Sequence, residues 1–143
     1  MKTQNYKDLL VWQKGIALAK VTYRLTQMFP SAEKFGLIAQ MRRAAVSIPS
    51  NLAEGQARHT TGEFIQFISH AEGSVAELDT QLILSAELKF CDSPSAAPAL
   101  ELIDELRRML NVLRRKLVAR HYLSLATHHL SCLFESRTLS WIR

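Results

Sequence analysis

The sequence has 143 residues, of which 48% are hydrophobic and 22% charged, and its net charge is +5. These proportions are typical of a soluble globular domain and exclude a disordered, collagen-like or disulfide-rich chain. The two cysteines, Cys91 and Cys132, are too few for a disulfide framework and favour a reducing compartment. No signal-peptide core and no apolar run long enough to span a bilayer is present, so we expect a cytoplasmic protein without a membrane partner.

Residues 6–28 are predicted to form the first helix. Its expected buried face consists of apolar residues three or four positions apart, namely Leu9, Trp12, Ile16, Ala19 and Tyr23. The Phe29-Pro30 pair ends this helix, because proline disfavours helical geometry at the residue before it. Ser31 is then predicted to cap the second helix, with Glu33 near its positive end.

Residues 36–58 are predicted to form a second helix with two ordered faces. The apolar face consists of Ile38, Met41, Ala45, Ile48 and Leu52. A polar stripe recurs at the same steps on another side: Gln40, Arg43, Ser47, Asn51, Glu54 and Arg58. Pro49 removes one backbone hydrogen bond inside this helix. A kink is favoured over a true break capped by Ser47, because the apolar period continues through the proline.

Residues 60–90 are predicted to form a third helix, which opens on the capping-box spacing of Thr60 and Glu63. The apolar face is Phe64, Ile68, Ala71, Val75, Leu78, Leu82 and Ala86. A second polar stripe consists of Gln66, His70, Gly73, Glu77 and Gln81. Gly73, followed by Ser74, costs about 1 kcal/mol relative to alanine in a helix. It therefore indicates a close approach, either by a neighbouring helix of the bundle or by a second subunit.

Residues 98–125 are predicted to form a fourth helix after a loop rich in proline and serine at 91–98. Its seam is Leu102, Leu106, Leu110, Leu113 and Leu117. Equal helices and short connections predict an all-α, antiparallel up-down-up-down four-helix bundle over residues 1–126. The period fails afterwards, so 127–143 is predicted to be an irregular tail, either free or docked. The residues available for docking are Leu133, Phe134, Trp141 and Ile142.

A basic cluster lies on the fourth predicted helix, where no acidic residue occurs from Leu106 to Phe134. Such a cluster can neutralise the phosphates of a nucleic acid. A solvated helix face without a ligand is an equally good interpretation. The candidate binding residues are Arg107, Arg108, Arg114, Arg115, Lys116 and Arg120, with Arg42 and Arg43 as second candidates.

Residues suited to catalysis or metal binding are sparse. Glu54 and Glu77 are the only carboxylate pair worth considering for a hydrolase. The Glu-x-x-His repeat of di-metal bundles is absent. His128, His129 and Cys132 share one helical turn but lack a fourth ligand nearby. We therefore expect no enzymatic activity, no cofactor and no metal.

Several motifs in a fixed order resemble one family over about residues 6–120. They include Tyr6-Lys-Asp-Leu-Leu-Val-Trp-Gln-Lys14, Phe35-Gly-Leu37, Gln40-Met-Arg-Arg-Ala-Ala-Val-Ser-Ile48 and Gly73-Ser-Val-Ala-Glu-Leu78. The family is the four-helix-bundle proteins encoded by intervening sequences of bacterial large-subunit ribosomal RNA genes, related to the accessory variability determinant of diversity-generating retroelements. The resemblance implies a homopentameric barrel. Because the retroelement relative binds nucleic acid and a reverse transcriptase through its basic surface, it also implies a nucleic-acid or protein partner.

The leading functional hypothesis is therefore a non-enzymatic oligomeric scaffold that binds RNA or DNA through positive charge, with little base specificity. The alternative is a protein-interaction scaffold with no nucleic-acid role. In either case the two polar stripes are expected to be neighbours and to form one surface at a subunit contact or in the lumen of the barrel. This surface would comprise Arg43, Ser47, Asn51, Glu54, Arg58, Gly73, Ser74, Glu77 and Gln81.

Overall fold

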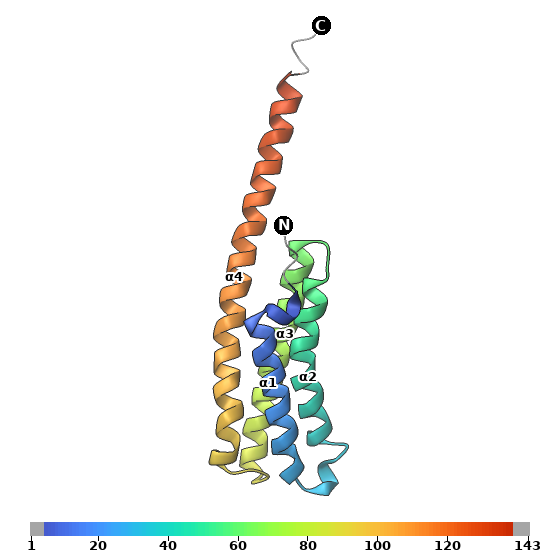
Figure 1. Ribbon diagram of the computed structural model, residues 1–143, viewed down its shortest axis with the longest axis vertical. Helices are drawn as coiled ribbons and strands as arrows, with labels where there is room; N and C mark the ends of the chain where they lie inside the picture. The colour runs from blue at the N-terminus through green and yellow to red at the C-terminus, as the bar shows by residue number, and fades with distance from the viewer. Residues whose placement is uncertain (1–4, 139–143) are drawn as a thin grey trace.

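The computed structural model describes the backbone of residues 5–138 and the side chains of residues 5–126. The four helices α1 to α4 run in alternating directions as one bundle (Figure 1). They are α1 (Leu10–Leu25), α2 (Leu37–Gln56), α3 (Thr61–Glu87) and α4 (Ser93–Thr138), with short 3-10 turns η1 (Tyr6–Asp8), η2 (Thr26–Met28) and η3 (Ser31–Glu33). Helices α1 and α3 each pack against both α2 and α4. The predicted all-α four-helix bundle is thus confirmed. Within the described residues, none of these helices combines the length and hydropathy needed to cross a bilayer.

Helix α1 begins later than predicted and buries a different face. Asn5 accepts a hydrogen bond from the Lys7 N–H and caps η1, after which Leu9 is extended at φ −72° and ψ 117°. The predicted face was only partly right: Leu9, Trp12 and Ala19 are partly buried against the core, but Tyr23 is 44% exposed and the fully buried residues are Val11, Gly15, Leu18, Thr22 and Leu25. Thr22 can be buried there because its hydroxyl donates to the Leu18 carbonyl.

Helices α1 and α2 approach each other closely where Gly15 meets Pro49. A Cβ added to Gly15 would lie 3.3 Å from both Cβ and Cδ of Pro49. Pro49 is buried inside a continuous helix, so the alternative of a true break at Ser47 is excluded. The kink at Pro49 stays a prediction. A glycine on α1 thus accommodates the proline ring of α2.

Carboxylates bind the first backbone N–H groups at the starts of α2 and α3. The predicted Ser31 cap is wrong, because a 3-10 turn occupies this position and Glu33 Oε2 instead accepts the Leu37 N–H at 3.0 Å. The capping box of α3 is confirmed: Thr60 Oγ1 accepts the Glu63 N–H, and Glu63 Oε2 accepts the Thr60 N–H. The Thr60 hydroxyl, 2.7 Å from that carboxylate, lowers the pKa of Glu63.

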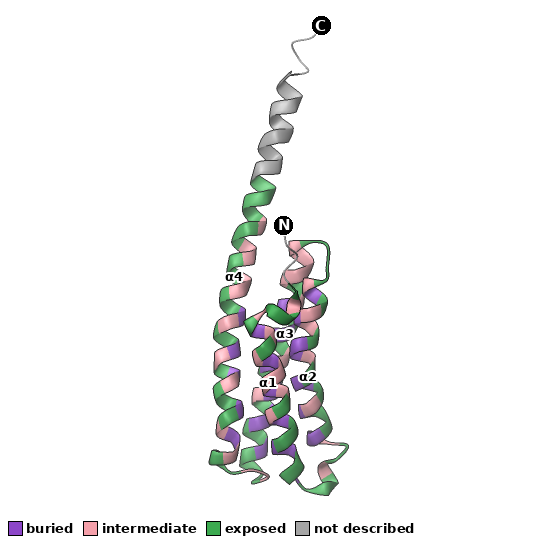
Figure 2. Ribbon diagram, viewed as in Figure 1, coloured by how far each residue is buried: buried purple, intermediate pink, exposed green. Residues whose placement is uncertain are grey.

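The core lies between the four helices (Figure 2). The predicted apolar face of α2 is buried throughout, and so is that of α3 except for half-buried Phe64 and exposed Ala86. On α4 the core residues are Ala96, Ala99, Ile103, Leu106 and Leu110. The predicted seam residues Leu102, Leu113 and Leu117 are only partly buried at its edge.

Helix α4 is longer than predicted at both ends. It begins at Ser93, inside the predicted loop, where the Asp92 carboxylate accepts the Ser95 N–H at 2.9 Å. It continues to Thr138, so the irregular tail predicted from 127 onward is wrong as far as 138; residues 139–143 lie outside the described residues. The helix projects beyond the other three (Figure 1). The sequence-based prediction relied on an apolar period, and a helix that extends past its bundle needs no such period.

Candidate nucleic-acid interface

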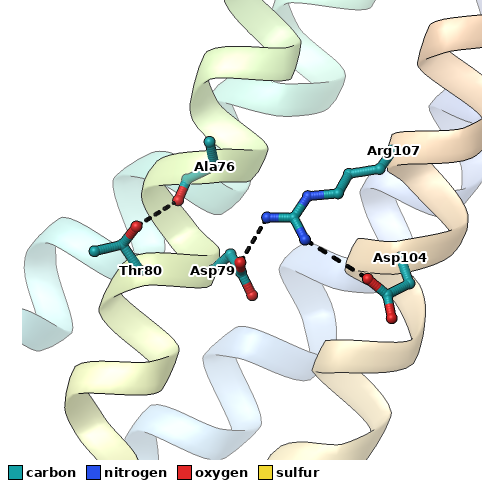
Figure 3. A network of polar contacts seen from close by, with 5 residues as sticks. All are labelled: Ala76, Asp79, Thr80, Asp104 and Arg107. Atoms are coloured by element: carbon teal, nitrogen blue, oxygen red, sulfur yellow. Dashed lines mark hydrogen bonds and ion pairs between the residues drawn. The ribbon is translucent and has the colours of Figure 1, made fainter.

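The basic cluster of α4 divides into two groups. Arg107 forms ion pairs with Asp79 of α3 at 2.5 Å and with Asp104 of α4 at 3.6 Å (Figure 3). Arg114 donates from Nε to Glu72 Oε1 of α3 at 3.2 Å. These two arginines therefore link α3 to α4, although the sequence placed them with the rest of the cluster.

The remaining four cations form what we call the α4 basic band: Arg108, Arg115, Lys116 and Arg120. All four are exposed, and none has an acidic partner within the part of the chain whose side chains are described. Arg108 and Arg115 are seven residues apart and so lie along one line of the helix. The band is an exposed positive surface along α4.

An apolar groove lies beside this band, between the start of α1 and the middle of α4. Its volume is about 380 Å³, and Arg108 and Lys116 are among the lining residues. Leu10 is 57% and Val112 50% exposed, so solvent reaches much of its apolar wall. The other lining residues are Leu9, Val11, Met109 and Leu113.

The polar stripes of α2 and α3 meet at a pair of serines. Ser74 Oγ donates to Ser47 Oγ at 3.0 Å, and Asn51 Nδ2 donates to the same Ser47 Oγ at 2.9 Å. Asn51 Nδ2 also donates to the Ser47 carbonyl at 2.8 Å. The two stripes are therefore adjacent in the bundle, as one hydrogen-bonded strip across the α2–α3 contact.

The two candidate catalytic carboxylates of the strip are each engaged by a residue four positions further along the chain. Glu54 forms an ion pair with Arg58, whose guanidinium lies over the ring of Phe67 at 4.8 Å. Glu77 accepts a hydrogen bond from Gln81 Nε2 at 3.0 Å. Neither carboxylate lines the α1–α4 groove. This arrangement gives no support to a hydrolase.

Two members of the strip, Gln81 and Gly73, lack a contact within the protomer. Gln81 is only 7% exposed, and its Oε1 is buried without a hydrogen-bond partner in the described structure. Gly73 is exposed, and a Cβ added to it would meet no atom within 4 Å. The prediction that a neighbouring helix of the bundle approaches Gly73 is therefore wrong, and only the subunit alternative remains as a proposal.

A second basic surface lies at the corner between α1 and the start of α2. Arg42, a second candidate from sequence, lies 4.7 Å over the ring of Tyr23 and donates from Nε to Thr26 Oγ1 at 2.9 Å. Lys34 Nζ lies 5.5 Å from the ring centroid of Phe35. The pocket there has a volume of about 490 Å³ and is lined by Tyr23, Lys34, Phe35, Ile38, Ala39, Arg42, Arg43 and Val46.

Sequence reasoning missed the aromatic residues of this corner. It treated Tyr23 as core and gave Phe35 no role beyond the family motif. The available signal was the pair Lys34-Phe35 placed just before the basic pair Arg42-Arg43 on the next helix.

Residues 5–126, whose side chains are described, contain no cluster of His, Cys, Asp and Glu side chains that could bind a metal ion. Cys91 is a free, half-buried thiol whose pKa is raised by burial. The turn of His128, His129 and Cys132 lies outside the described side chains.

Comparison with known protein families matches most of the chain. A family model described as 23S rRNA-intervening sequence protein matches residues 7–112. No curated protein matches the chain. The matched span covers α1 to α3 and the first part of α4, and it ends before three of the four residues of the α4 basic band.

Proposed function

The chain belongs to the family of 23S rRNA-intervening sequence proteins, and on that premise we propose that it is a non-enzymatic, oligomeric scaffold that binds nucleic acid, RNA above all, through exposed positive charge. The observation that carries the proposal is the α4 basic band, whose cations have no acidic partner among the described side chains. The family description names no ligand. The choice of nucleic acid rests on charge and on the family resemblance in the sequence.

The binding mode follows from the chemistry of the band. Guanidinium and ammonium groups on an exposed helix face neutralise backbone phosphates and release the condensed counterions. The band consists of three arginines and one lysine, and contacts of such side chains to phosphates carry no sequence information. We therefore expect affinity with little sequence preference and a steep loss of binding as salt rises.

A pair of charge-matched double variants tests this proposal. Arg115→Gln/Arg120→Gln removes two charges from the band, whereas Lys20→Gln/Arg24→Gln removes two exposed charges from α1. The two variants have equal net charges because each loses two positive charges. A non-specific effect of charge would therefore weaken RNA binding equally in both. The proposal requires the α4 variant to bind RNA more weakly than the α1 variant. Equal weakening would contradict a localised site.

We also infer that protomers associate through the polar strip of α2 and α3. The open space at Gly73 and the hydrogen-bonded Ser47–Ser74 pair support this inference, because a small exposed residue lets another backbone approach closely. The pentamer expected from the resemblance would need a second, different face on each protomer. Light scattering in solution measures the subunit number.

The alternative function is a protein-interaction scaffold, and the α1–α4 groove is the observation that favours it. Exposed Leu10 and Val112 in a groove flanked by two cations would suit an apolar segment of another protein. Copurification separates the two functions. A high ratio of absorbance at 260 to 280 nm favours nucleic acid, and a stoichiometric protein partner favours the alternative.

A further inference from the structure

The corner between α1 and α2 presents two aromatic rings among cations, and we call it the aromatic corner: Tyr23, Lys34, Phe35, Arg42 and Arg43. Phe35 is 88% exposed, the highest value among the large hydrophobic residues of the described chain. Single exposed apolar residues are common on protein surfaces, so the informative feature is that this ring shares a pocket with three cations, Lys34, Arg42 and Arg43. A ligand that covers it must offer both an apolar face and negative charge.

The exposure of Phe35 is imposed by an ordered turn. On one side of the turn, Glu33 Oε2 accepts the Leu37 N–H at 3.0 Å, and the Gly36 N–H donates to the Glu33 carbonyl at 3.0 Å. A Cβ on Gly36 would lie 2.6 Å from Glu33 Oε2, so a larger residue there would push the Glu33 carboxylate away from the Leu37 N–H. The backbone therefore holds Phe35 outward before any ligand arrives.

The cations of the corner are available to an anion. Lys34, Arg42 and Arg43 form no ion pair with any acid among the described side chains. Arg42 is held in place by the Tyr23 ring and by Thr26 Oγ1, yet keeps further guanidinium N–H donors. The first turn of α2 supplies Ile38 and Ala39 to the same pocket, so the positive end of the helix dipole adds to the charge.

We propose that the aromatic corner binds unpaired nucleotides of a single-stranded nucleic acid. The rings of Phe35 and Tyr23 stack on bases, and Lys34 and Arg43 hold the flanking phosphates. This combination of stacking platform and cations suits single strands, because the bases of a duplex are already paired and stacked. The inference rests on the proposed function and adds a strand preference that the α4 basic band, which offers charge alone, does not supply.

The test measures binding of the full chain to an unstructured RNA of about 12 nucleotides and to the corresponding duplex. Three variants change only the exposed ring: Phe35→Ala, Phe35→Leu and Phe35→Trp. Stacking predicts that the alanine and leucine variants lose about 10-fold in affinity for the single strand and nothing for the duplex. The tryptophan variant keeps single-strand affinity, because it retains a π face.

Other outcomes overturn the inference in distinguishable ways. If the wild-type chain binds both RNAs and Phe35→Ala binds the single strand equally well, the corner is not the site and the proposed function stands. If Phe35→Leu behaves like the wild type, the ring is an apolar contact and does not stack. If Phe35→Ala changes the particle mass while RNA affinity stays constant, Phe35 belongs to a subunit contact. If the wild type binds neither RNA, the proposed function and the inference both fail.

Discussion

The guanidinium of Arg107 on α4 lies 2.5 Å from the carboxylate of Asp79 on α3 (Figure 3). The next residue, Arg108, has no acidic partner among the described side chains. Adjacent residues of one helix point about 100° apart. One arginine therefore links two helices while the next stays free for a ligand. The positive charge of α4 is only partly available for binding.

The first prediction compares a linking arginine with a free one. Arg107→Gln should lower the free energy of unfolding by about 0.5 kcal/mol, since the pair is partly exposed and screened by solvent. Arg115→Gln should leave stability unchanged and weaken RNA binding more than Arg107→Gln does. Chemical denaturation and RNA titration of the two variants measure this. Equal RNA affinities of the two variants would contradict the distinction between a linking arginine and a binding arginine.

The second prediction concerns two glycines with opposite surroundings. Gly73→Ala gains about 1 kcal/mol of helix propensity, meets no other atom within its own protomer and should stabilise the fold of that protomer. Gly15→Ala gains the same propensity but places a Cβ 3.3 Å from buried Pro49, so α1 must move away and the net change should be destabilising. Denaturant midpoints at one fixed protomer concentration measure both. A stabilised Gly15→Ala variant would contradict this, because it would mean that α1 and α2 move apart at little cost in free energy.

The third prediction uses the same glycine to test association. Gly73→Leu projects a large side chain from the polar strip into the open space beside α3. If a second subunit approaches there, the variant should shift the particle mass toward the monomer while helicity is kept. Ala86→Leu, at an exposed position near the other end of α3, is the control. An unchanged mass for Gly73→Leu would remove the strip from the subunit contact.

The fourth prediction concerns the start of α3 and its pH dependence. Because the folded state lowers the pKa of Glu63 from its ordinary value of 4.5, its carboxylate stabilises the fold above that pH. The stabilisation is lost as the pH falls through the lower folded-state pKa. The stability gap between wild type and Glu63→Gln should thus be constant near neutrality and shrink below about pH 4.5. A gap that persists at pH 2 would contradict a role for the charge.

The sequence predicted α2 and α3 well because their apolar periods are uninterrupted and nearly every member packs against another helix. It was only partly right on α1, where two overlapping periods compete and the fully buried one includes Thr22, whose polarity hides it. The C-terminal extension of α4 was missed for a different reason. A helix without a neighbour has no face to bury and leaves no periodic signal.

The candidate site was predictable only in part. The sequence located the cations of α4, but which of them are free depends on Glu72 and Asp79 of α3, residues far away in the chain. The exposure of Phe35 depends on the hydrogen bonds of Glu33 to Leu37 and Gly36, which no periodicity records.

The central claim, that the free cations of α4 bind nucleic acid, is tested most directly by RNA affinity across a salt series for the wild type and for Arg115→Gln/Arg120→Gln. The claim predicts that affinity falls steeply with salt. It also predicts that the variant has a logarithmic slope shallower by about 1.4 for single-stranded RNA, or about 0.7 for each phosphate that is no longer neutralised. An RNA affinity that does not change with salt, or a slope that is identical in the variant, would contradict it.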